Sequence, residues 1–260
     1  MIRGLYTAVT GLMTQEARQN VITQDLSNAN TTGYKSDDVK VKDFKEVMLQ
    51  NYQNIVNGKN QRSVIGSLSY GSAVDETTTD FSQGILKDTG LDTDFALNGK
   101  GFFVVSKDDG TGNLTNYYTR DGHFSVDLNG YLIDESGNKV MGRNSATGAD
   151  EPIQVGNAKL TMDSSNNLYL DGKQAYKFDL VDFNNYNSMQ KIGDNLYSAQ
   201  NPINSDAVVN EKKLENSNVN VANAVTDMMT AYRIYESNQK VVQAMDETLG
   251  KAVNDVGTVR

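Results

Sequence analysis

The chain has 260 residues, and its 33 acidic side chains outnumber its 24 basic ones, giving a formal net charge of −9. We expect no nucleic-acid partner for such a chain, because phosphate binding needs a concentrated positive surface. The chain has no cysteine and one histidine, His123, which excludes disulfides, thiolate metal sites and multi-histidine metal sites.

The sequence contains no long apolar segment. No apolar run approaches the roughly 18 residues that a membrane span needs, so we expect no membrane span. The opening sequence MIRGLYTAVTGLM lacks the continuous apolar core and small-residue cleavage site of a secretory signal. A chain of this kind that leaves the cytoplasm is expected to use another route.

A first helix is predicted over residues 2–29. Apolar side chains recur there at steps of three and four, and the series weakens and returns with a shifted phase: Ile2, Leu5, Val9 and Leu12, then Ile22, Leu26 and Ala29. Such a shift favours several packing partners over one continuous coiled coil. Gly33 is a natural stop after the helix.

Residues 35–72 form a polar transition segment. Asp43 is placed to cap a short helix that carries Phe44, Val47 and Met48. Residues 57–72 are predicted to be extended or loop chain, because Gly58, Gly66 and Gly71 interrupt regular structure there.

From about residue 73 to 200 the pattern is typical of short β-strands separated by turns. Predicted strands cover 95–97, 102–105, 115–119, 124–127, 131–134, 160–162, 168–170 and 176–183. The turns between them carry Gly, Asn and Asp, as in Asn98-Gly99 and Asn129-Gly130. Many short strands at regular spacing predict an antiparallel β domain.

The last forty residues predict a second, longer helix. A heptad series runs through it, and nine of its eleven members are apolar or aromatic: Val221, Val225, Met228, Tyr232, Tyr235, Gln239, Val242, Asp246, Leu249, Val253 and Val256. This pattern is typical of a helix that buries a narrow stripe against another helix. Gln239 and Asp246 are the two polar members, and their role stays open.

The length of this second helix raises the question of what covers it. About 36 residues make a helix of roughly 54 Å, whereas a globular middle of about 140 residues has a radius of gyration near 14 Å. A half-exposed stripe does not offset the entropy of ordering so many residues. We therefore expect both terminal helices to complete their burial on neighbouring copies, and to become helical as they assemble. An intramolecular helix pair that covers the β domain is the alternative.

Four features resemble chemical sites but fit simpler interpretations. Gly99-x-Gly101 precedes a strand rather than a helix, so it is predicted to be a hairpin turn and not a nucleotide loop. Asp127-Leu-Asn129-Gly130 and residues 134–138 lack the spacing of a calcium loop. The acidic pairs at 37–38 and 108–109 are predicted to be solvated, and His123 has no nearby nucleophile. We predict no catalytic, cofactor, metal or small-molecule site.

Four stretches of the chain resemble the bacterial flagellar rod and hook proteins, the axial proteins of the basal body. They are LSNANTTGYK at 26–35, DFALNGKGFF at 94–103, YTRDGHF at 118–124, and LENSNVNV at 214–221 leading into AYRIYESN at 231–238. They occur in the family's order and span nearly the whole chain. The middle two, and the length, favour a distal or proximal rod protein over the longer hook protein.

This resemblance implies a non-enzymatic structural subunit of the rod. Members of the family pass unfolded through the flagellar type III export apparatus and assemble helically into a tube that joins the motor to the hook. The implied partners are copies of the chain, other rod and hook proteins, and the export apparatus. The implied location is the flagellar basal body in the cell envelope.

The predicted fold class is α+β, with terminal helices that pair as a coiled-coil-like layer and a central antiparallel β domain. Carried over from the family, residues 1–34 and 217–260 form the inner assembly domain, 35–72 a bracing segment, and 73–216 the outer β-rich domain. The predicted assembly residues in the N-terminal part are Leu5, Val9, Leu12, Ile22, Leu26, Asn28, Asn30, Gly33 and Tyr34. Those in the C-terminal helix are Val221, Val225, Met228, Tyr232, Tyr235, Val242, Leu249 and Val253.

Two other classes of protein remain as alternatives. A secreted adhesin would use the β domain for binding and the helices as an oligomerising stalk, and would form a small closed oligomer rather than a tube. An enzyme would need a convergent set of His, Asp or Glu side chains, which the sequence does not indicate.

Overall fold

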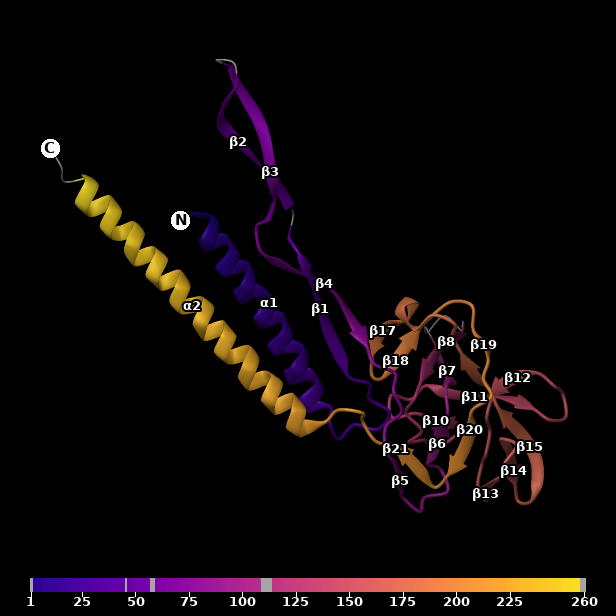
Figure 1. Ribbon diagram of the computed structural model, residues 1–260. Helices are drawn as coiled ribbons and strands as arrows, with labels where there is room; N and C mark the ends of the chain where they lie inside the picture. The colour runs from indigo at the N-terminus through magenta and orange to yellow at the C-terminus, as the bar shows by residue number, and fades with distance from the viewer. Residues whose placement is uncertain (1, 45, 57–58, 109–113, 258–260) are drawn as a thin grey trace. The chain divides into compact units, whose positions relative to one another are not determined.

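The computed structural model describes residues 2–44, 46–56, 59–108 and 114–257 (Figure 1). Statements about side chains concern residues 3–44, 46–50, 64–108 and 114–254. Predictions that rest on Asn57, Gly58 or Asp109, or on the side chains of Ile2 and Val256, lie outside these ranges.

The chain is α+β, as predicted, and divides into two compact units. Unit 1 comprises Met1–Leu26, Asp37–Thr78 and Asn220–Arg260, and unit 2 comprises Ser27–Ser36 and Thr79–Val219. Helices α1 (Ile2–Ser27) and α2 (Val221–Gly257) lie at the two ends of the chain. In the described part of the chain, neither helix combines length and apolar content sufficient to cross a membrane.

The strands of unit 1 form two narrow ribbons. Strand β1 (Asp37–Asp43) pairs with β4 (Ser72–Thr79), and β2 (Glu46–Val56) pairs antiparallel with β3 (Lys59–Ser69). The short helix predicted around Phe44, Val47 and Met48 is therefore wrong. Three apolar residues fit one helical turn as well as a strand, and the deciding partners lie about twenty residues later, where Val47 pairs with Leu68.

Unit 2 is the predicted antiparallel β domain. Its main sheet has the order β13-β14-β15-β11-β7-β8-β18-β17. The strands are β5 (Leu86–Asp88), β6 (Phe95–Asn98), β7 (Phe102–Asp108), β8 (Leu114–Thr119), β9 (Ser125–Val126), β10 (Leu132–Ile133), β11 (Lys139–Asn144), β12 (Asp150–Pro152), β13 (Leu160–Met162), β14 (Asn167–Leu170), β15 (Lys173–Phe178), β16 (Leu180–Asp182), β17 (Gln190–Gly193), β18 (Leu196–Ser198), β19 (Ile203–Asn204), β20 (Val208–Glu211) and β21 (Lys213–Glu215). A short 3-10 helix, Tyr186–Ser188, precedes β17.

Strand β7 lies at the centre of this unit because both of its faces are buried. Phe103 and Val105 pack in one apolar cluster, and Phe102 and Val104 pack in a second cluster. Successive side chains of a strand point to opposite faces, so the continuous apolar run Phe102–Val105 serves two cores at once. This placement explains why the run does not alternate with polar residues.

Two strand predictions need correction. Residues 95–97 and 102–105 are strands joined by a turn, but they do not form a hairpin, because β6 pairs with β20 and β7 pairs with β8. Gly99 and Gly101 have φ angles of 115° and 148°, which direct the chain from one sheet into the other. The single strand predicted over 176–183 is divided between β15 and β16.

Within unit 1, α1 and α2 lie side by side (Figure 1), and they approach each other at two glycines. A Cβ added at Gly4 would lie 2.5 Å from Met245 Cε, and one added at Gly11 would lie 2.8 Å from Asn238 Nδ2. The two glycines are seven residues apart, and so are their partners in the reverse direction. The helices therefore run antiparallel with a heptad spacing between contacts.

Candidate assembly surfaces and the motif junction

The surface of α2 contains one narrow, partly covered stripe. Its members alternate at steps of four and three, and only Ala231 among them is fully buried: Ala224, Met228, Ala231, Tyr235, Asn238, Val242, Met245, Leu249 and Ala252. All other described side chains of α2 up to Asn254 are exposed. A period of 3.5 residues over this length is the pattern of a helix that contacts another helix along one line.

The predicted C-terminal assembly residues divide between this stripe and the exposed surface. Met228, Tyr235, Val242 and Leu249 lie in the stripe. The other predicted residues, Val221, Val225, Tyr232 and Val253, have exposed side chains, as do the polar pair Gln239 and Asp246. Exposed apolar side chains in one helix face mark a surface available to a partner.

The predicted residues of α1 are mostly half-buried. Leu5, Leu12, Ile22 and Leu26 are intermediate in exposure, and Val9 is exposed. The buried positions of α1 are instead Ala8, Thr14 and Asp25. Thr14 Oγ1 lies 3.3 Å from Ser72 Oγ, and Asp25 Oδ1 accepts from Asp37 N, so polar contacts with the β1–β4 ribbon cover this face.

A turn follows α1, in the stretch where Gly33 was predicted to stop the helix. The Asn28 carbonyl accepts from Thr31 N at 3.1 Å, and Asn28 Oδ1 accepts from Thr31 Oγ1 at 3.2 Å. Asn30 is exposed, whereas Gly33 and Tyr34 are buried. The segment that follows α1 thus enters the interior of unit 2.

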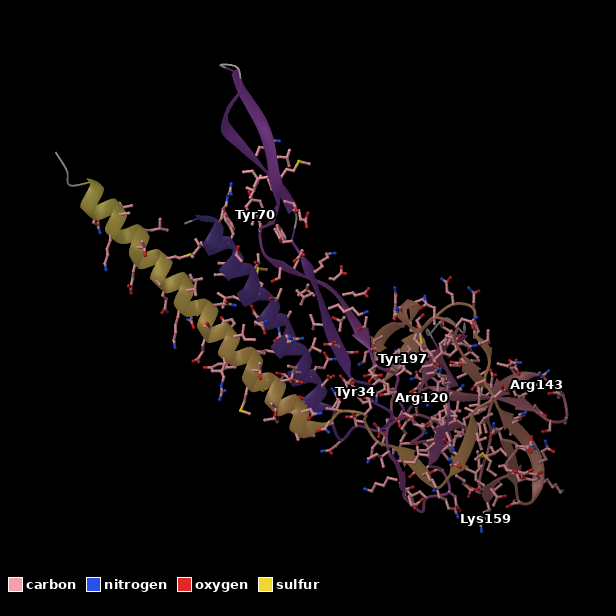
Figure 2. All side chains as sticks on the ribbon, in the orientation of Figure 1. Tyr34, Tyr70, Arg120, Arg143, Lys159 and Tyr197 are labelled. Carbon is pink, nitrogen blue, oxygen red and sulfur yellow. The ribbon has the colours of Figure 1, made fainter. Side chains whose placement is uncertain are left out.

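Three of the motif stretches meet in unit 2, at a site that we call the junction. The junction consists of residues 32–36, Arg120, Asp121, Lys191, Asn195 and residues 215–218. Figure 2 labels two of its members, Tyr34 and Arg120. The junction joins the chain that follows α1 and the chain that precedes α2 to the same region of the β domain.

Gly33 is fixed in the junction by its backbone. Its amide donates to the Glu215 carbonyl at 2.8 Å. Its φ angle is 65°, and a Cβ there would lie 2.5 Å from Asp121 N and 2.6 Å from Arg120 C. Both the left-handed conformation and the close approach of two backbones require glycine.

A buried ion network lies beside Gly33. Glu215 Oε1 is 2.6 Å from Lys35 Nζ and Glu215 Oε2 is 3.4 Å from Arg120 Nη1, with all three side chains almost fully buried. Lys35 also donates to the Ser82 carbonyl at 2.7 Å, and Gly84 N donates to Glu215 Oε1 at 2.8 Å. Burial lowers the pKa of Lys35, while the Glu215 carboxylate opposes that shift.

The carboxylate of Asp121 is a second acidic group that binds the segment after α1, through Thr32. Its Oδ1 accepts from Thr32 Oγ1 at 2.7 Å and from His123 N at 3.0 Å. Burial raises the pKa of Asp121 to about 6, and these two hydrogen bonds oppose the rise. His123 itself bridges to Asp94, with 2.8 Å between its Nδ1 and Asp94 Oδ1.

Asn218 joins the two connecting segments directly. Its Oδ1 accepts from Ser36 N at 2.8 Å, and its Nδ2 donates to the Asp80 carbonyl at 2.8 Å. Ser36 in turn accepts from Asp80 N through its carbonyl at 2.8 Å. The amide side chain of Asn218 thus satisfies a backbone N–H group of Ser36 and a backbone carbonyl of Asp80.

Side chains from the β17–β18 region complete the junction. Lys191 Nζ lies 4.2 Å from the centre of the Tyr34 ring and donates to the Lys35 carbonyl at 3.3 Å. Asn195 Nδ2 donates to the Thr32 carbonyl at 2.9 Å. The ring of Tyr34 is buried, so this cation–π contact is shielded from water and stronger than a surface one.

The buried charges Lys35, Arg120 and Glu215 are paired with one another. Within the described residues, no group of three or more His, Cys, Asp or Glu side chains could hold a metal ion. Sequence reasoning found the motifs but assigned no role to Arg120, Asp121 or Glu215. Glu215 and Lys35 are 180 residues apart, and no local pattern links them.

Comparison with protein families places these features in a known class. Three family descriptions match the chain: "Flagella basal body rod protein" over residues 5–35, "Flagellar hook protein FlgE/F/G D1 domain" over 96–168, and "Flagellar basal body rod FlgEFG protein C-terminal" over 211–255. The two terminal matches contain most of α1 with residues up to Lys35, and most of α2 with Glu215. Residues 32–35 and 215–218 of the junction thus fall inside matched regions.

Full-length relatives agree with this classification. The chain is 31% identical to the flagellar hook-basal body complex protein FlhO of Bacillus subtilis, over 100% of both chains. It is 31% identical to the flagellar basal-body rod protein FlgG of Buchnera aphidicola (subsp. Schizaphis graminum), over 96% of this chain and 98% of that one. It is 30% identical to FlgG of Borreliella burgdorferi, over 98% of each. The chain belongs to the flagellar basal-body rod protein family, whose members are structural proteins and not known enzymes. These comparisons give no support to the adhesin alternative.

Proposed function

We propose that this protein is a structural, non-enzymatic subunit of the flagellar rod that assembles helically into the tube between motor and hook. The observation that carries the proposal is the exposed apolar surface of the terminal helix α2. Tyr232 is 55% exposed and Val253 is 70% exposed, although both belong to a regular apolar series. A head-to-tail contact through such a surface, repeated without closing on itself, builds a filament.

The terminal helices form the inner, coiled-coil-like layer of this tube in our proposal. Residues 1–34 and 217–260 supply it, and 73–216 face outward. The partly covered stripe of α2 packs on α1 of the same chain, and the exposed positions Val221, Val225 and Tyr232 contact neighbouring copies. Leu5, Leu12, Ile22 and Leu26, half-buried in the single chain, complete their burial in the same way.

Residues 35–72 brace neighbouring subunits. Met48 is 66% exposed and Ile65 is 68% exposed on the β2–β3 ribbon. A two-stranded ribbon of this kind is marginally stable alone in water, so a neighbouring subunit is the natural source of its missing contacts.

The further partners in this proposal are other rod and hook proteins and the flagellar export apparatus. In this proposal the chain passes the apparatus unfolded and functions in the basal body of the cell envelope. Helices that need neighbours for their burial remain unfolded during passage, which prevents early polymerisation.

Electron microscopy of basal bodies from a strain that lacks this chain tests the proposal. We expect rods that end short of the hook, and restoration of full rods when the gene is returned. Complete rods with intact hooks in the deletion strain would exclude a rod role.

The polar positions Gln239 and Asp246 provide a finer test in the same strain. Both are exposed in the single chain, so changing both to Leu should leave the folding of the subunit intact. If they fix the register between copies, we expect the double variant to assemble poorly. Unchanged assembly would argue against a register role.

A further inference from the structure

We infer that the junction makes the two connecting segments, residues 32–36 and 213–218, attach to and detach from the rest of unit 2 in one cooperative step. The first segment follows α1 and the second precedes α2. Glu215 and Asn218, both in the second segment, contact the first segment within a single chain.

Glu215 contacts the first segment in two independent ways. Its backbone carbonyl accepts from Gly33 N, and its carboxylate pairs with Lys35 Nζ at 2.6 Å. Strand β21, which carries Glu215, is itself held on β5 through the pairs Lys213–Asp88 and Glu215–Leu86. The N-terminal segment therefore lies against a strand that comes from the other end of the chain.

The charges make separate release of either segment costly. If residues 213–218 left, Lys35 and Arg120 would remain buried without the carboxylate that they share. If residues 32–36 left, the Glu215 carboxylate would lose Lys35 and would keep the 3.4 Å contact with Arg120 and the hydrogen bond from the Gly84 amide. Removing one partner of a buried ion pair leaves an uncompensated buried charge, which is strongly destabilising.

Asn218 adds a second connection at the far end of the same segments. Its carbonyl oxygen accepts from Ser36 N, and its amide donates to the Asp80 carbonyl and, at 3.1 Å, to Ser82 Oγ. Ser82 also accepts from Lys35 through its backbone carbonyl. The two connections thus share Ser82, so loss of one weakens the other.

Coupling between the segments is reciprocal by thermodynamic necessity. Since the segments lead into the two terminal helices, ordering of one segment favours ordering of the other. The use of this coupling in assembly rests on the proposed function, because it would let docking of one helix on a neighbour promote docking of the second. The coupling itself does not depend on assembly.

Hydrogen exchange measured by mass spectrometry on the full chain tests the inference with Glu215→Gln. This change leaves the direct partners of the Gly33 and Ser36 amides in place, since those partners are the Glu215 backbone carbonyl and Asn218. We expect exchange at both amides to become at least tenfold faster. In the reverse direction, Lys35→Met should accelerate exchange at Asn216, whose amide donates to the Ile85 carbonyl.

Lys213→Gln is the matched control, because it lies on the same strand and removes an ion pair with Asp88 at 3.2 Å that is partly exposed on both sides. This control should leave the hydrogen-exchange rates of both segments unchanged. If Glu215→Gln accelerated exchange only within 213–218 and left Gly33 and Ser36 unchanged, the segments would be independent and the inference would be overturned.

A milder variant serves if Glu215→Gln does not fold. Asn218→Ala removes only hydrogen bonds, and the Gly33 amide donates to Glu215 and not to Asn218. Faster exchange at Gly33 in this variant supports the coupling, and an unchanged rate there contradicts it. Because these measurements use the unassembled chain, a failure here would leave the rod proposal standing, and short rods in the deletion strain would not rescue the coupling.

Discussion

Gly33 meets two steric requirements at once, a φ angle of 65° and backbone atoms of Asp121 within 2.7 Å of any added Cβ. We expect Gly33→Val to block assembly and leave the β domain folded. The left-handed conformation alone costs roughly 1–2 kcal/mol for a residue with a side chain, and the clash displaces the segment after α1. Swarming motility of the mutant strain reports on assembly. Far-UV circular dichroism of the purified variant reports on the folding of the β domain.

Gly148→Val separates strain from steric clash in the same assay. Gly148 has a φ angle of 70° but no heavy atom within 4 Å of an added Cβ. This control should lose some stability and retain motility. Normal motility in Gly33→Val would contradict the assembly role of the turn.

Asp121 gives the stability of unit 2 a pH dependence opposite to that of most carboxylates. Its pKa is raised from 3.8 to about 6, so between these values the native state holds a proton that the unfolded state has released. The contribution of this group to the free energy of unfolding therefore falls as pH rises from about 4 to 6, by about 3 kcal/mol in total. We expect Asp121→Asn to remove this slope.

The asparagine in this variant can keep both hydrogen bonds, because Thr32 and His123 donate to the same oxygen, Oδ1. Urea unfolding of both proteins between pH 4 and 7 gives the comparison, and other carboxylates cancel in the difference between them. Parallel pH profiles for the two proteins would mean that Asp121 is not desolvated in solution.

At the scale of elements, α2 shows what a heptad pattern can and cannot predict. Its existence and length follow from the apolar series, and Met228, Tyr235, Val242 and Leu249 lie in the covered stripe. The remaining stripe positions precede the predicted ones by a single residue, as with Ala231 beside Tyr232. Hydrophobicity favours the larger side chain, whereas close approach of two helices favours the smaller one, and sequence alone does not decide between them.

For the strands, the sequence predicts their positions but not their pairing. Turn residues located the strands of unit 2 well, because Gly and Asn mark conformations that other residues avoid. Pairing between distant strands was not predictable: β6 pairs with β20 across more than a hundred residues. The same limit applies to Lys35 and Glu215, since complementary charges far apart in the sequence carry no signal of their contact.

The β2–β3 ribbon should be the least stable of the described sheets. It pairs only with itself, and Met48, Val64 and Ile65 are mostly exposed, whereas β7 is buried on both faces. We expect amides of β2 and β3 to exchange at least a hundredfold faster than those of β7 and β8 in the dilute chain. Hydrogen exchange with mass spectrometry measures both regions in one experiment.

Assembly should reduce this difference in exchange rate if the ribbon braces neighbouring subunits. Exchange in β2 and β3 should then slow markedly in polymerised protein, while β7 and β8 change little. Equal exchange rates for the two regions in the dilute chain would mean that the ribbon is stabilised within a single subunit.

At the scale of the whole molecule, the two units differ in how they reach stability. Unit 2 has two apolar clusters and buried strands, so it has the parts of an independently folding domain. Unit 1 has a long helix with one partly covered stripe and two narrow ribbons. Helix stability in proteins comes mainly from burial of an apolar face, and most of the described surface of α2 is exposed.

We therefore expect dilute monomer to have less helix than assembled protein. The 37 residues of α2 and the 26 of α1 amount to about a quarter of the 260-residue chain, so their ordering would change the far-UV circular dichroism signal at 222 nm substantially. Near-UV signals from the tyrosines of the β domain should stay constant during assembly, because unit 2 is already folded. A dilute monomer that already shows both long helices fully formed would contradict the idea that neighbours order the termini, and would place the origin of helix stability in the α1–α2 contact at Gly4 and Gly11 instead.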